Sequence, residues 1–165
     1  GASFGTNPDL MASVVAAVRA ATSLTLITKL APNVPDIRVF AKAAADAGSD
    51  ALSICNTLPA MAIDIEARRP VLANVTGGLS GPAIHPVAVK LVWEASAAVD
   101  IPIIGMGGIA EPEDAIELLA AGATAVAVGT ANFIDPTTTL RVLAGIYEYM
   151  HRHGMARVAD IAIPH

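Results

Sequence analysis

Short apolar runs that alternate with helical segments constrain the fold of this chain more than any other feature. The four runs, at 24–30, 51–55, 101–104 and 125–128, contain a single charged residue, Lys29. Such runs are typical of a parallel sheet, because a strand that is buried on both faces loses the alternation of polar and apolar residues. One helix followed by four strand and helix units therefore predicts an α/β fold.

Helix boundaries follow from proline, asparagine and glycine. Asn7 and Pro8 mark the start of the first helix, and Gly48 is placed as the C-terminal cap of the second. The expected helices run from Pro8 to about Val18 and over 36–48, 86–99, 112–121 and 136–151. The connection between the second run and the third helix contains GGLSG at 77–81, which has too many glycines for a helix and is a candidate anion-binding loop.

An internal repeat indicates which kind of α/β fold the chain belongs to. DAGSDALSICNT at 46–57 and AAGATAVAVGTA at 120–131 share a glycine that closes a helix, an apolar strand and a small polar residue after it. Repeated units of this kind build a (β/α)8 barrel, although a doubly wound sheet shares much of the pattern. Because a complete barrel needs at least about 200 residues, the four strands expected in these 165 residues amount to half a barrel. A fragment, missing segments and a smaller open fold all remain compatible with this length.

Composition excludes several classes of protein. The net charge of -5, without a dense cluster of lysine and arginine, argues against nucleic acid as a partner. Glycine and proline interrupt every long uncharged tract, so no membrane-spanning helix is expected. The lone Cys55 excludes an internal disulfide framework and a multi-cysteine metal site, and we expect a cytoplasmic protein.

Glycine ends the last two apolar runs, at the edge where a parallel sheet carries its ligand-binding loops. GMGG follows the third run and GT follows the fourth. Loops and helix N-termini at this edge present free backbone N–H groups, and glycine lets the backbone approach an anion. In barrels a phosphate site commonly follows the seventh and eighth strands. Gly107, Gly108, Gly129 and Thr130 therefore predict a phosphate site, although a tight turn explains a single glycine pair equally well.

Other candidate residues follow the first two apolar runs. Lys29 ends an apolar strand, where a solvated lysine is poorly placed, and is suited to a Schiff base or to an anionic ligand. Asn56 and Thr57 are candidates for hydrogen bonds to a polar heterocycle, with ordinary turn residues as the alternative. Cys55 is interpreted as a buried small residue, not a nucleophile. His85 is a candidate to face the site, but an ordinary turn histidine next to Pro86 is the simpler interpretation.

Five segments together carry a resemblance to a known family. They are KLAPNVPDI (29–37), ICNTL (54–58), NVTGGLSGPAIHPVAVKLV (74–92), IPIIGMGGI (101–109) and AVAVGTANF (125–133). This series resembles the catalytic subunit of class 1B dihydroorotate dehydrogenases, an FMN-containing (β/α)8 barrel. The resemblance implies that residues 1–165 are about the last four βα units, the C-terminal half of this single barrel domain. The related domain of dihydropyrimidine dehydrogenase is also similar.

The resemblance implies roles for particular residues. Asn56 and Thr57 match positions that bind the pyrimidine substrate, and Lys29 matches the lysine at the isoalloxazine ring of FMN. Cys55 takes a position that contacts FMN, through its main chain. The positions that the resemblance assigns to FMN are Lys29, Cys55, Gly81, Gly107, Gly108, Gly129 and Thr130, of which the last four form the phosphate end.

The resemblance also implies a reaction and partners. The family oxidises dihydroorotate to orotate in pyrimidine (UMP) biosynthesis, with a cysteine as the base and FMN as the hydride acceptor. That cysteine is expected upstream of FGTNP at 4–8, so no catalytic residue is assigned within this chain and the chain alone is expected to be inactive. We expect a homodimer and a partner subunit that carries FAD and a 2Fe-2S cluster, with NAD as the final electron acceptor.

Two other hypotheses stay open at this point. One is a non-catalytic half-barrel that binds phosphate or flavin and needs a partner to cover its open sheet edges. The other is a Schiff-base aldolase that uses Lys29 as its nucleophile.

Overall fold

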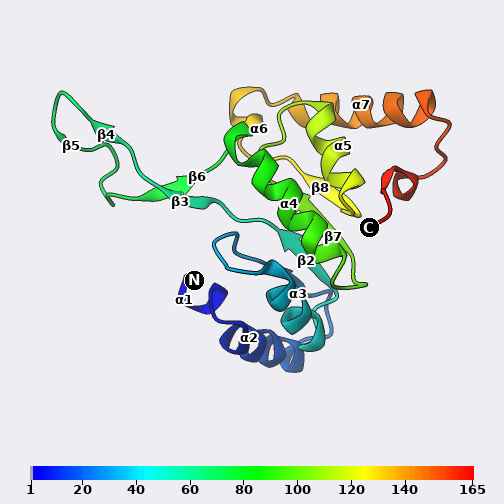
Figure 1. The fold of residues 1–165 in the computed structure, drawn as a ribbon, viewed down its shortest axis with the longest axis horizontal. Helices are drawn as coiled ribbons and strands as arrows, with labels where there is room; N and C mark the ends of the chain where they lie inside the picture. Colours follow the sequence, from blue (N-terminus) through cyan, green and yellow to red (C-terminus); the bar gives the residue numbers. More distant parts are fainter. Residues whose placement is uncertain (1) are drawn as a thin grey trace.

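The computed structural model describes residues 2–165, with side chains described from residue 4 onward. Its centre is a parallel sheet with the strand order β1-β2-β7-β8 (Figure 1). The four strands are β1 (Ile27–Lys29), β2 (Ala51–Ile54), β7 (Ile103–Met106) and β8 (Ala125–Ala127). The α-helices are α1 (Ala2–Gly5), α2 (Pro8–Ala21), α3 (Ile37–Asp46), α4 (His85–Ser96), α5 (Pro112–Ala120), α6 (Ala131–Ile134) and α7 (Thr138–Arg152). Short 3-10 helices cover Pro82–Ile84 and Val158–Ile161.

The predicted helices are confirmed, and the capping side chains explain where two of them begin. Asn7 Oδ1 accepts a hydrogen bond from the Leu10 N–H at 3.0 Å, which starts α2 at Pro8. Asp36 caps α3 in the same way, through a bond of 3.0 Å from the Arg38 N–H. The short helices α1 and α6 were not predicted, because four residues are too few to show a helical period.

Two strands differ in their bounds from the prediction. The first was expected from residue 24, but β1 begins at Ile27, because Arg19 donates to the carbonyl of Leu24 at 2.9 Å and holds that segment against α2. The third was expected over 101–104, but β7 covers 103–106. Pro102 has no N–H to donate to the sheet, so the regular pairing begins after it.

The register of the parallel strands places alternate residues on opposite faces of the sheet. Lys29 is opposite Ser53, Ser53 is opposite Ile104, and Ile104 is opposite Ala125. These four residues therefore share one face. The carboxyl ends of all four strands lie at the same edge of the sheet, and their loops meet there.

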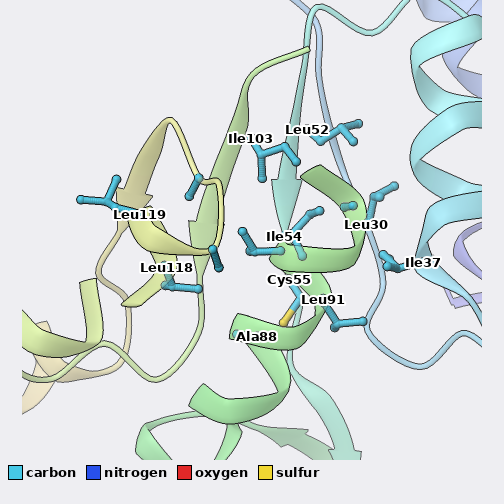
Figure 2. Packing of buried hydrophobic residues seen from close by; sticks show 14 of the residues in the cluster. Leu30, Ile37, Leu52, Ile54, Cys55, Ala88, Leu91, Ile103, Leu118 and Leu119 are labelled. Carbon is cyan, nitrogen blue, oxygen red and sulfur yellow. The ribbon is translucent and has the colours of Figure 1, made fainter. Parts of the chain in front are cut away.

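The other face of the sheet forms the hydrophobic core. Leu52 and Ile54 are fully buried and Ile103 is 2% exposed. They belong to one cluster with apolar residues of the helices, including Ala88 and Leu91 of α4 (Figure 2). This packing fixes the strand ends, and with them the loops that form the pocket described below.

The face that carries Lys29 is only partly covered within residues 2–165. Ser53 is buried there, whereas Ile27 is 46% exposed and Ala125 is also exposed. The strands β1 and β8 each pair with one neighbour only. The sheet is therefore open along both edges, which is the arrangement expected of part of a barrel.

A two-part β arm projects from the body of the molecule between β2 and α4 (Figure 1). Its inner pair is β3 (Leu58–Ala60) with β6 (Gly77–Leu79), and its outer pair is β4 (Ile63–Asp64) with β5 (Arg69–Pro70), both antiparallel. The sequence did not predict these strands, because segments of two or three residues are too short to show alternation. GGLSG at 77–81 belongs partly to β6, where Gly78 lies so close to Thr57 that a side chain has no room.

Candidate functional site

A pocket of about 220 Å³ lies at the carboxyl ends of the four parallel strands. All nine residues that the sequence singled out as ligand contacts line it: Lys29, Cys55, Asn56, Thr57, Gly81, Gly107, Gly108, Gly129 and Thr130. They come from five segments: the end of β1 and the loops after β2, β6, β7 and β8. The parallel sheet brings four of these segments together because its strands all end at one edge. The structure thus unites these residues, while their individual roles stay predictions.

Glycine is required at two of these positions and leaves open space at a third. Gly107 and Gly108 have φ angles of +129° and +74°, which side chains other than glycine rarely adopt. A Cβ on Gly108 would lie 2.7 Å from the Cβ of His85 and 2.9 Å from the carbonyl oxygen of Gly81. Around Gly129, in contrast, no atom lies within 4 Å of the place a Cβ would take. The pocket is therefore tightly walled at Gly108 and empty beside Gly129.

Backbone N–H groups at this end of the pocket are free to bind a ligand. Within residues 2–165, those of Gly108, Gly129 and Thr130 have no hydrogen-bond acceptor. The Thr130 hydroxyl donates to the Ser80 hydroxyl at 2.8 Å, which ties the loop after β8 to the loop after β6. Ser80 also lines the pocket but was not named as a candidate; its place in GGLSG was the only signal for it. Free N–H groups beside open space are suited to an anion.

The other end of the pocket carries a lysine and an amide side chain. Lys29 is the only charged side chain among the described residues that line the pocket, and it forms no ion pair within residues 2–165. Asn56 Oδ1 accepts a hydrogen bond from the Thr57 N–H at 2.8 Å, so the amide group of Asn56 keeps its donors for a ligand. A cation and an amide at one end thus face a set of N–H donors at the other.

Cys55 lies between these two ends and is 4% exposed. Burial raises the pKa of its thiol to about 11, while the nearby charge of Lys29 opposes this rise. The side chain therefore stays a neutral thiol at physiological pH and is a poor nucleophile or base. This agrees with the interpretation of Cys55 as a buried small residue.

His85 differs from the prediction of an ordinary turn residue. It is the first residue of α4 and is 7% exposed. Its Nδ1 lies 2.9 Å from the carbonyl oxygen of Gly107, and its Nε2 lies 3.1 Å from Oε2 of Glu117. The sequence gave no sign of this contact, because Glu117 lies 32 positions further along the chain.

Two negative findings concern the described residues alone. Among the helices of residues 2–165, none combines the length and the apolarity that are needed to cross a bilayer. The same part of the chain contains no group of three or more side chains arranged to hold a metal ion.

Comparison with known proteins identifies the family. The model of the family described as dihydroorotate dehydrogenase matches residues 1–150. The chain belongs to the dihydroorotate dehydrogenase family. This confirms the resemblance that the five sequence segments indicated.

Relatives in this family share more than half of their aligned residues with the chain. A protein of Pelobacter propionicus, named dihydroorotate dehydrogenase B (NAD(+)), catalytic subunit, is 56% identical over 158 residues, which are 96% of this chain and 52% of that protein. A protein of the same name from Alkaliphilus oremlandii is 55% identical over 161 residues, 98% of this chain and 53% of that protein. The chain thus spans about half the length of the curated relatives it matches, and their name implies that they have a further subunit.

Solved structures of the family confirm the fold. The dihydroorotate dehydrogenase of Eimeria tenella in complex with ferulenol has a TM-score of 0.79 and 25% identity, over 96% of this chain and 48% of that one. Its ligand-free form has the same TM-score and 26% identity, over 97% of this chain and 50% of that one. The four βα units are therefore part of a (β/α)8 barrel, as the sequence predicted.

Proposed function

We propose that the protein is an FMN-dependent dihydroorotate dehydrogenase of the B type, which oxidises dihydroorotate to orotate in pyrimidine biosynthesis. The observation that carries this proposal is the convergence of nine residues, from five separate segments of the chain, on one pocket at the carboxyl edge of the sheet. Active sites of (β/α)8 enzymes occupy this edge. Residues 1–165 supply the C-terminal half of the barrel in this proposal.

The pocket fits a flavin mononucleotide in two respects. The free N–H groups of Gly108, Gly129 and Thr130, together with the empty space beside Gly129, suit the phosphate. Lys29 supplies the only positive charge among the described lining residues, at the opposite end, where it would stabilise the negative charge of a reduced ring. Bound FMN supplies the hydride acceptor.

The remaining lining residues take supporting roles in this proposal. Asn56 and Thr57 lie at the base of the β arm and would hydrogen-bond the pyrimidine substrate. Cys55 would contact the cofactor, and its neutral, buried thiol is not proposed as the base. We propose that a cysteine outside residues 1–165 takes the proton from the substrate.

The open edges of the sheet and the names of the relatives suggest what completes the enzyme. Further strands of the same barrel would pair with β1 and β8. A second copy of the protein and an electron-transfer subunit with FAD and a 2Fe-2S cluster would form the complex, with NAD as the final acceptor. We propose that this complex works in the cytoplasm.

Anaerobic reduction tests the proposed function directly. When the intact protein is mixed with dihydroorotate in the absence of oxygen, its visible flavin absorption should bleach, because the hydride has no acceptor beyond the flavin. Dihydrouracil, which lacks the carboxylate, is the matched control and should leave the absorption unchanged. Bleaching by dihydrouracil alone would indicate a relative of dihydropyrimidine dehydrogenase, and bound flavin that neither compound reduces would favour the non-catalytic hypothesis.

A further inference from the structure

His85 is a buried polar residue to which the proposed reaction gives no role. It lies between the glycine loop after β7 and helix α5, and its side chain is 8% exposed. Its ring contacts the backbone of Gly107 on one side and carboxylates of α5 on the other. A buried imidazole that joins a ligand-binding loop to a neighbouring helix is placed to control the shape of that loop.

Both ring nitrogens of His85 face hydrogen-bond acceptors. Nδ1 lies 2.9 Å from the carbonyl oxygen of Gly107, and Nε2 lies 3.1 Å from Oε2 of Glu117 and 3.9 Å from Oδ1 of Asp114. A neutral imidazole has one N–H and can donate to only one of these groups, whereas the imidazolium ion donates to both. No other charged side chain of residues 4–165 lies within ion-pair distance of this ring. Because a carbonyl oxygen can only accept, the bond to Gly107 requires the proton on Nδ1.

The bond to Gly107 determines where the next N–H group points. In a planar trans peptide, the carbonyl and the following N–H point in opposite directions. Because His85 binds the carbonyl of Gly107, the N–H of Gly108 is turned away from His85, and it has no acceptor within residues 2–165. Gly108 also packs directly on His85, since a Cβ added to Gly108 would lie 2.9 Å from the backbone N of His85. The glycine loop is thus held in one orientation by this side chain.

We propose that His85 is a positioning residue that orients the Gly107 to Gly108 peptide, so that the Gly108 N–H donates to the phosphate of the flavin. Glu117 acts through His85, because its Oε2 lies 3.1 Å from Nε2 and fixes the orientation of the ring. This inference rests on the proposed function, since it requires FMN as the ligand. It also explains why a buried imidazole lies behind the glycine loop, outside the pocket lining itself.

The test compares the affinities of FMN and riboflavin, which differ only by the phosphate, for the flavin-free intact protein. His85→Phe keeps a ring of similar volume without its donors, and it should reduce the preference for FMN over riboflavin about five- to tenfold, as expected for one lost hydrogen bond. His85→Gln, which retains an amide donor, should recover part of the preference. His151→Phe makes the same change at an exposed position of α7 and should leave the preference unchanged.

A double-mutant cycle gives a second readout that a purely structural role would not change. Glu117→Gln should reduce the preference for FMN over riboflavin less than His85→Phe does, because the bond from His85 to Gly107 remains. Added to His85→Phe, the same replacement should have no further effect, because Glu117 acts only through His85.

The possible outcomes separate this inference from the proposed function. If the wild-type protein does not prefer FMN to riboflavin, the proposed phosphate site is wrong. If the wild type prefers FMN and both His85 variants retain that preference in full, only the positioning role is wrong. If His85→Phe fails to fold, Glu117→Gln decides, since Glu117 is 63% exposed and its replacement does not disturb the core; an unchanged preference for FMN over riboflavin in Glu117→Gln would then overturn the inference.

Discussion

Replacing Gly129 by leucine should reduce the affinity for FMN by about 100-fold or more while the protein still folds, a loss of about 2.7 kcal/mol. No atom lies within 4 Å of the place of a Cβ at Gly129, so the new side chain meets no protein group and enters the pocket. There it would occupy the space that we assign to the phosphate. The free energy of unfolding should change by no more than about 0.5 kcal/mol, as is usual at sites without packing contacts. Fluorescence titration with FMN and urea unfolding of the intact protein measure the two quantities.

Two further variants show whether such a loss is specific. Ala17→Leu adds similar bulk at an exposed position of α2, away from the pocket, and should bind FMN normally. Gly108→Ala should lower stability itself, because its Cβ would lie 2.7 Å from that of His85 and the φ angle of +74° disfavours alanine. Full FMN affinity in Gly129→Leu would show that the phosphate lies elsewhere.

Replacing Lys29 by alanine should slow the reduction of bound flavin by dihydroorotate about 100-fold. This substitution removes the only positive charge among the described residues that line the pocket. A preorganised charge or donor in an active site commonly raises the reaction rate about 100-fold or more. Stopped-flow spectroscopy of the intact protein, without oxygen and with saturating FMN, measures this rate. Stability should change little, because Lys29 is exposed and pairs with no carboxylate within residues 2–165.

The matched control is Lys42→Ala, which removes an exposed lysine of α3 that does not line the pocket. Its reduction rate should equal that of the wild type. If dihydroorotate reduces the bound flavin at the same rate in Lys29→Ala as in Lys42→Ala, the charge of Lys29 does not act at the ring. A fall in stability that matches the fall in rate would instead assign Lys29 a structural role.

The central fold was predictable because local signals and packing agree. Asn7 and Asp36 are good helix caps, and each caps a helix that the sequence predicted at that place. The apolar runs became the parallel strands, because Leu52, Ile54 and Ile103 bury one face of the sheet under the helices. Parallel strands end at one edge, so the residues that follow them had to meet. The grouping of the candidate residues in one pocket therefore follows from the fold class.

Features that depend on contacts between distant segments were not predictable. The β arm consists of pairs of two or three residues, which show no alternation in the sequence. His85 looks like a turn residue because its partner Glu117 is on another helix. Ser80 is identified as a site residue only by the folded structure, in which it accepts a hydrogen bond from Thr130, 50 positions away. In each case, tertiary packing decides the role of a residue whose neighbours in the sequence are uninformative.

The relative affinities for FMN and riboflavin measure whether the glycine end of the pocket binds a phosphate, because only FMN carries one. The flavin-free intact protein should bind FMN about 100-fold or more tightly than riboflavin, since several N–H groups donate to a charged group. Isothermal titration calorimetry with both compounds, in the same buffer, measures the ratio. Equal affinities would contradict the assignment of the glycine loops to phosphate, and with it the proposed orientation of the flavin between Gly129 and Lys29.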